Sequence, residues 1–259
     1  MNPRVTDLAL TALNGRRLFL LVFLLLWGSF CWSGAVEPAV KMTLEDSVAA
    51  GPNDGRMTEE PSVQELGGDR FRIGAITVDR SQRLITLPGR MIPYEEGKPI
   101  EFVATMRQGY KAYESVLELD ANAFEFNLAC ILIGLDPDKA SNVEYHFDPN
   151  PISGDKVALR VGWRVNEQWI EIDVAELVIV GEEKPATPSV WVYTGSLFIE
   201  GDRYMAQMDG VLIGLIHDPA SIIEHREGIG IGNWGSIAID PEVAPAGGQE
   251  IVLQVQALD

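Results

Sequence analysis

The sequence predicts an α+β fold rich in β-structure: one predominantly antiparallel β domain with a single central buried helix at about residues 122–134. Short runs in which apolar and polar residues alternate recur from Phe71 to the end of the chain, and this pattern is typical of half-buried strands. Among them stands one segment with helical spacing, "NAFEFNLACILIG". A chain of 259 residues with 46% hydrophobic side chains can bury a sizeable core.

The first predicted strands are "FRIGAITVD" and "RLITLPGRMI", which are separated by a hairpin turn at residues 80–82, and "PIEFVATM" follows them. In "VALRVGWRV" every second residue from Val157 to Val165 is apolar, which places Trp163 in the core. The same alternation in "QWIEIDV" turns Ile170 and Ile172 inward and leaves Trp169 on the outer face of its strand.

The predicted helix has a start signal and a stop signal. Asn122 is placed as its N-cap, and Glu125 three residues later completes a capping box. One apolar face is formed by side chains at helical spacing, namely Phe124, Leu128, Ile131 and Leu135. Further apolar residues extend around the helix, so we expect it to be buried in the domain. Gly134 ends it.

The first 35 residues have the composition of an export signal. Arg16 and Arg17 precede an apolar run from Leu18 to about Trp32, and small residues follow it. The run is shorter than the ~20 residues that a membrane-spanning helix needs, so we expect a signal peptide, with an uncleaved anchor as the alternative. The stretch "RRLFL" also resembles the twin-arginine export pattern. The protein is therefore expected in the periplasm or outside the cell.

The remaining chain divides by composition into two parts. Residues 36–69 are rich in Pro, Gly and acidic residues and predict a flexible acidic linker. Residues 70–259 form the predicted β-rich domain. Once the signal is removed, Cys130 is the one cysteine left, so neither an internal disulfide nor a cysteine-based metal cluster is expected.

The charge of the chain argues against a nucleic-acid partner. Asp and Glu number 38 against 20 Lys and Arg, a net charge of -18, which repels phosphate backbones. We expect membrane contact only through the N-terminal segment, if that segment is not cleaved. The expected partner is an envelope protein or a small ligand.

Glu144, His146 and Asp148 form the candidate metal site. They alternate in "VEYHFDP", so on a strand all three side chains would project from one face. Imidazole and two carboxylates suit zinc or iron, and a divalent metal is the one cofactor that the sequence raises. The alternative is a solvated strand end, because Pro149 and Pro151 follow at once. No residue is singled out as catalytic.

The order of motifs along the chain carries a resemblance. "KAYESVL" leads into the helix, and "WVYTGS", "MDGVLIGLIHDPASII" and "PEVAPAGGQEIVLQV" follow. Together they resemble the YdjY-domain family of exported bacterial proteins, in the long version found in planctomycete-type genomes, over about residues 71–256. In relatives, histidine often stands at the position of Tyr113, and a cysteine can stand near Thr105. Such a pair implies a metal or redox role. This chain has neither residue at these positions, which counts against that role here.

Two interpretations remain for Tyr113 and Glu114, just ahead of the helix. In the first, Glu114 hydrogen-bonds backbone or a basic group and Ser115 satisfies backbone groups nearby. In the second, Tyr113 and Glu114 line a pocket with Trp191 and Tyr193 of "WVYTGS".

We therefore expect an exported, non-catalytic envelope protein that binds or assembles with another molecule. One alternative is a metal-dependent enzyme or accessory factor that uses Glu114, Glu144, His146 and Asp148. A second alternative is a carbohydrate-binding module, in which Trp169 stacks on a sugar instead of packing under a loop.

Overall fold

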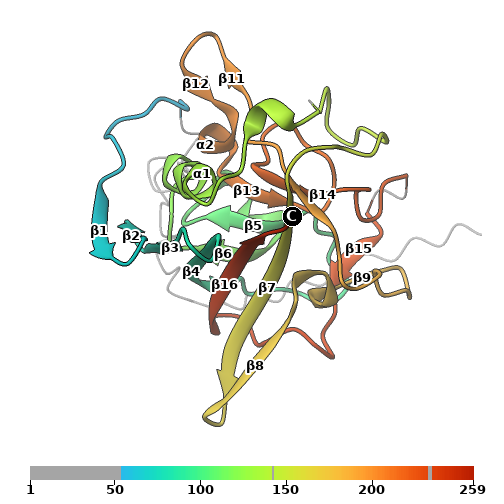
Figure 1. Ribbon diagram of the computed structural model, residues 1–259. Coiled ribbons are helices and arrows are strands. Elements are labelled where there is room, and N and C mark those ends of the chain that lie inside the picture. Colours follow the sequence, from blue (N-terminus) through green and yellow to red (C-terminus); the bar gives the residue numbers. More distant parts are fainter. Residues whose placement is uncertain (1–53, 142, 233–234) are drawn as a thin grey trace, which may run out of the picture. The chain divides into compact units, whose positions relative to one another are not determined.

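The structure is a computed structural model that describes residues 54–141, 143–232 and 235–259 (Figure 1). These residues form a β-rich mixed barrel of eight strands with a few short helices. The β-rich class predicted from the sequence is therefore confirmed, whereas the alternating patterns alone did not indicate a barrel.

Eight strands close the barrel, in the order β4 (Leu84–Met91), β16 (Glu250–Ala257), β7 (Lys156–Val165), β10 (Trp191–Tyr193), β14 (Ile223–His225), β13 (Val211–Gly214), β5 (Phe102–Met106) and β6 (Ser115–Leu119). The pairs β13–β14 and β5–β6 are parallel, and the other barrel pairs are antiparallel. The barrel is thus mixed, although antiparallel pairing dominates as predicted.

The remaining strands extend this barrel or stand beside it. They are β1 (Val63–Gly67), β2 (Arg70–Ile73) and β3 (Ile76–Asp79), which continue the sheet from β4; β8 (Gln168–Asp173), which pairs with β7; and the two small pairs β9 (Val178–Val180) with β15 (Ile237–Ile239) and β11 (Phe198–Ile199) with β12 (Arg203–Tyr204). Figure 1 shows the β7–β8 hairpin extending away from the rest of the barrel.

Strand β4 has two different neighbours along one of its edges. Its first half pairs with β3, and its second half pairs with β6 through Gly89 and Leu119, which closes the barrel. A β-carbon added at Gly89 would lie 2.5 Å from the backbone oxygen of Glu118 and 2.8 Å from Leu119 Cδ2. The missing side chain at position 89 therefore allows the two strands to approach closely enough to join.

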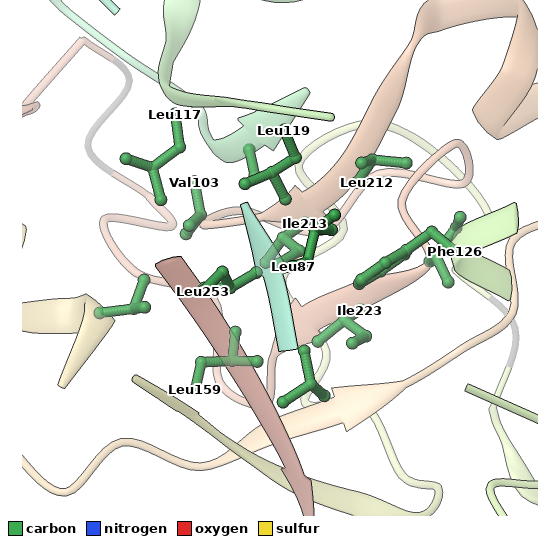
Figure 2. Close-up of a cluster of buried hydrophobic side chains, with 14 of the residues drawn as sticks. Leu87, Val103, Leu117, Leu119, Phe126, Leu159, Leu212, Ile213, Ile223 and Leu253 are labelled. Atoms are coloured by element: carbon green, nitrogen blue, oxygen red, sulfur yellow. The ribbon is translucent and has the colours of Figure 1, made fainter. Parts of the chain in front are cut away.

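The interior of the barrel is filled by the inward-facing half of each alternating strand. In β16 these residues are Ile251, Leu253 and Val255, all buried, and in β7 the residues from Val157 to Trp163 alternate in the same way. Figure 2 shows such side chains from several strands meeting in one cluster. The prediction that Trp163 lies in the core is confirmed. Val165 is 42% exposed, because the hairpin has left the barrel at that point.

Helices are few and short. They are α1 (Ala123–Leu132), α2 (Met205–Asp209) and three 3-10 turns at Tyr110–Glu114, Pro137–Lys139 and Val174–Leu177. The predicted capping box of α1 is confirmed: Asn122 Oδ1 accepts from the backbone of Glu125, and Glu125 Oε2 accepts from the backbone of Asn122. The prediction of a single helix is wrong, because α2 was not recognised in its short sequence.

The buried face of α1 is different from the predicted one. Ala123, Phe126, Ala129 and Cys130 are buried, whereas Ile131 is 45% exposed. Figure 2 shows Phe126 pointing toward Ile213 and Ile223 of the core cluster. The helix therefore packs one face on the barrel and is not buried on all sides. Because nearly every position of α1 is apolar, its sequence cannot tell which face makes this contact.

The described chain begins within the expected linker. The expected linker over residues 36–69 includes β1, so its last part is a paired strand at the edge of the sheet. The predicted signal, residues 1–35, and the linker up to residue 53 lie outside the described residues. Within the part of the chain that the structure describes, no helix is long and apolar enough to cross a membrane.

We expect Phe126→Ala to lower the free energy of unfolding by about 3–5 kcal/mol, because it removes a fully buried ring and leaves a cavity in the core. Ile131→Ala, on the exposed face of the same helix, should change it by no more than about 0.5 kcal/mol. Urea denaturation of both variants measures the difference. Equal losses would contradict the assignment of the buried face.

Candidate functional site

Glu114 and Tyr113 lie at the end of the 3-10 turn before β6. Lys111 Nζ donates to Glu114 Oε1 at 2.6 Å, and Ser115 Oγ donates to the backbone oxygen of Lys111 at 2.8 Å. Burial by itself would lower the pKa of Lys111, but the hydrogen bond and the charge of Glu114 outweigh it and raise that pKa. The first interpretation of Glu114 is therefore confirmed: it pairs with a basic group at this junction.

Tyr113 itself points outward. It is 56% exposed and stands edge-on to Tyr110, with 6.4 Å between the ring centroids. Partial burial, followed by the charge of Glu114, raises the pKa of Tyr113. Glu114 lines a cavity of about 140 Å³ together with Glu101 and Phe147. Tyr113 is not among the lining residues of that cavity.

Trp191 and Tyr193 are core residues of β10. Both are fully buried; the Tyr193 hydroxyl donates to Asn127 Oδ1 of α1 at 2.6 Å, and burial raises its pKa. The Trp191 ring stands edge-on to His225 with 5.3 Å between centroids. Neither side chain reaches the surface, so the structure does not form the expected pocket between this strand and Glu114.

The candidate metal ligands do not share a strand face. Residues 143–148 form loop and turn, and Phe147 has a φ of 63°, so the alternating geometry expected for this segment is wrong. Glu144 is exposed, while the Asp148 carboxylate accepts from the backbone and the side-chain amide of Asn150. The backbone hydrogen bond from Asn150 lowers the pKa of Asp148.

His146 is paired with two carboxylates that sequence reasoning did not associate with it. Its Nδ1 lies 2.5 Å from Asp218 Oδ2, and its Nε2 lies 3.1 Å from Glu101 Oε2. The hydrogen bonds to Asp218 and then to Glu101 raise the pKa of His146 to about 9 against the effect of burial. A ring that is protonated on both nitrogens has no lone pair for a metal. Throughout the described ranges, no group of three or more His, Cys, Asp or Glu side chains is arranged to hold a metal ion.

The same region contains a buried carboxyl group. Glu224 is fully buried on β14, and its Oε1 accepts from the backbone of Asp218 at 2.6 Å. Burial raises its pKa well above the ordinary value. Glu224 on β14 thus contacts Asp218 in one loop, and Asp218 contacts His146 in another. These contacts hold both loops against the barrel. Sequence alone had no signal for them, because His146 and Asp218 are 72 residues apart.

A groove on the outside of the barrel has a volume of about 520 Å³. Its floor is formed by Pro88 of β4, Val252 of β16 and Gly162 of β7, which are paired in register across the three strands. These residues alternate with the buried Leu87 and Leu253, so they face outward.

Trp169 of β8 forms one wall of the groove. A β-carbon added at Gly162 would lie 2.2 Å from Trp169 Cζ2 and 2.7 Å from Cε2, so the indole occupies the space that a side chain at 162 would fill. Its Nε1 donates to Glu171 Oε2 at 3.4 Å. Trp169 is nevertheless 45% exposed. The expected outer-face position of Trp169 is confirmed, and glycine on the neighbouring strand explains why the ring can lie across the sheet.

The other walls are charged and polar. Arg90 Nη2 donates to Glu118 Oε1 at 2.6 Å, Arg107 pairs with Asp120, and the Arg164 guanidinium lies 5.9 Å from the Trp169 ring centroid. Gln249 and Glu250 complete the rim. Of this groove, sequence reasoning found only Trp169, since the other residues come from strands and loops far apart in the chain.

Comparison with known proteins identifies the family. Residues 76–256 match the YdjY domain. The chain belongs to the YdjY domain family. The matched segment runs from the first residue of β3 to the last residue but one of β16, so it contains nearly the whole barrel and every residue of the groove. No curated protein and no solved structure matches the chain.

We expect the stability of the YdjY domain to depend on the charge of His146. Its pKa in the folded state, about 9, is above the ordinary 6.5, so its stabilising contribution is complete below about pH 6.5 and is lost as the pH rises through about 9. His146→Gln should remove this dependence. Urea midpoints of both proteins between about pH 6 and pH 10 test it, since other titrating groups are common to both. A constant difference across this range would contradict the pairing.

Proposed function

We propose that the protein is exported and that its YdjY domain binds a ligand in the groove beside Trp169 without transforming it. The observation that carries this proposal is the groove itself: an exposed indole, three arginines and two carboxylates surround about 520 Å³ of space. Ligand sites in proteins have volumes of roughly 300–1,000 Å³ and combine apolar or aromatic walls with a few polar groups.

The arrangement of titratable groups supports binding over catalysis. General acid–base chemistry needs a group whose pKa is tuned toward the working pH and which faces the substrate. His146 in its loop and Glu224 on β14 have strongly shifted pKa values, but neither side chain lines the groove. The lining charges Arg90 and Arg107 are each engaged with a carboxylate. Such a wall can recognise a ligand through the donors and acceptors that these pairs leave exposed.

Export is supported by the N-terminal sequence. Arg16 and Arg17 followed by the apolar run and small residues have the order of a signal peptide. An acidic domain of this kind would meet its partner, a small ligand or an envelope protein, outside the cytoplasm. Any membrane contact would be made by the N-terminal segment.

Binding is tested with a chemically mixed panel of neutral sugars, uronic acids, amino acids and short peptides, by calorimetry and tryptophan fluorescence. We expect at least one compound to bind, with affinity lowered about tenfold or more in Trp169→Ala, because the wall of the groove is lost. Tyr113→Ala is the matched control, since Tyr113 is a similarly exposed aromatic outside the groove. No Trp169-dependent binding by any class would contradict the proposal.

The export route is tested by replacing both Arg16 and Arg17 with lysine. Twin-arginine transport depends on the arginine pair, whereas general secretion needs only positive charge in this region. We expect the variant still to be exported, because the apolar run is strongly hydrophobic, as in general secretion signals. Fractionation with immunoblotting measures this, and the size of the exported chain reports cleavage. Retention of the variant in the cytoplasm would assign the twin-arginine route.

A further inference from the structure

We propose that the ligand of the groove is a neutral carbohydrate, with one sugar ring stacked on Trp169 and its hydroxyl groups bound by the arginine–carboxylate pairs. This inference rests on the proposed binding function and names its ligand class.

The aromatic wall of the groove suits a sugar ring. The C–H face of a sugar ring is apolar, and an exposed, fixed aromatic ring is the side chain that packs best on such a surface. Trp169 is fixed by its place over Gly162 and by the contact of its Nε1 with Glu171, yet nearly half of the residue is open to solvent. An indole held this way offers a rigid platform that loses little conformational freedom on binding.

The walls of the groove offer both hydrogen-bond donors and hydrogen-bond acceptors. A sugar hydroxyl donates one hydrogen bond and accepts others, so its site needs both kinds of group. Arg90 and Arg107 each have one Nη group engaged with a carboxylate in the bonds described above, and a guanidinium has five N–H donors in total. Asp120, Glu250 and Gln249 add acceptor oxygens around the same space. Planar groups of this kind can bind neighbouring hydroxyls in pairs.

The charge of the walls favours a neutral ligand over an anionic one. Glu118 and Asp120 already balance Arg90 and Arg107, and Glu250 stands beside them on the rim. The carboxylate of an acidic sugar bound by Arg107 would lie close to Asp120, which already occupies that guanidinium. The chain as a whole has a net charge of -18, so its long-range field also repels anions.

The floor of the groove is poorly suited to an extended peptide. Extended peptides are most often bound by adding a strand to a free sheet edge. The floor strands β4, β16 and β7 are each paired on both sides at the groove, β4 with β16 and β6, β16 with β4 and β7, and β7 with β16 and β8. Their backbone groups are thus occupied by one another. The floor therefore offers no free strand edge for a peptide, and its side chains face the ligand, which suits a sugar better than a strand.

The test is a titration of the purified protein with neutral oligosaccharides of glucose, mannose, galactose and N-acetylglucosamine, and with oligomers of galacturonate and alginate. We expect a neutral oligosaccharide to bind and to shift the tryptophan emission. Trp169→Ala should weaken it about tenfold or more, whereas Trp169→Tyr, which keeps an aromatic platform, should stay within about threefold of the parent.

Two further variants test the polar walls. Arg107→Gln should weaken the neutral sugar several-fold, because it removes donors and releases Asp120. Arg80→Gln is the matched control: Arg80 also pairs with an aspartate, Asp69, but lies outside the groove. Circular dichroism and urea midpoints confirm that each variant folds.

The outcomes are separable. Tighter binding of the uronate oligomers than of every neutral oligosaccharide overturns this proposal, and so does the absence of any neutral sugar binding. If an amino acid or peptide of the mixed panel then binds in a Trp169-dependent manner, the binding function stands and only its sugar assignment fails. If nothing in either panel binds through Trp169, both fail together.

Discussion

The fold depends on one close approach, the pairing of β4 with β6 at Gly89. This contact turns a long sheet into a closed barrel, because it joins the two end strands β4 and β6 beyond the point where β3 leaves the edge of β4. The approach requires a residue without a side chain, since a β-carbon at position 89 would collide with the backbone of β6. Closure encloses the inward halves of eight strands in one core, and Phe126 of α1 adds its ring to that core from the side (Figure 2).

Outside the barrel, polar contacts do two different kinds of work. Around His146, the carboxylates of Glu101, just before β5, and of Asp218, in a loop, contact the two imidazole nitrogens, and the buried Glu224 anchors the backbone of Asp218. These groups are occupied by one another, and breaking one would leave a buried charge or polar atom unpaired. These groups therefore hold the loops against the barrel. Their shifted pKa values would mark a reactive site in another setting.

On the outer face of β4, β16 and β7, charged and polar side chains also pair with one another, but here they surround an open groove. Gly162 again acts by lacking a side chain, this time to let Trp169 lie across the sheet. Arg90 and Arg107 stand at the edges of a small apolar floor and are held in position by carboxylates, while Arg164 lies beside the Trp169 ring. Two glycines thus determine two central features of the fold. Gly89 allows the barrel to close, and Gly162 allows Trp169 to shape the groove, in each case because glycine has no side chain.

The sequence by itself determined the β-rich class, the hairpin turn at residues 80–82, the capped start of α1 and the outward position of Trp169, because these follow from local periodicity and capping within a few residues. Only the tertiary structure decided which face of the uniformly apolar α1 is buried, that β1 is a strand within the expected linker, and that Trp191 and Tyr193 are interior. It also decided the partners of His146 and the walls of the groove. Those depend on the register and closure of strands distant in the chain, and such pairings leave no periodic mark in the sequence.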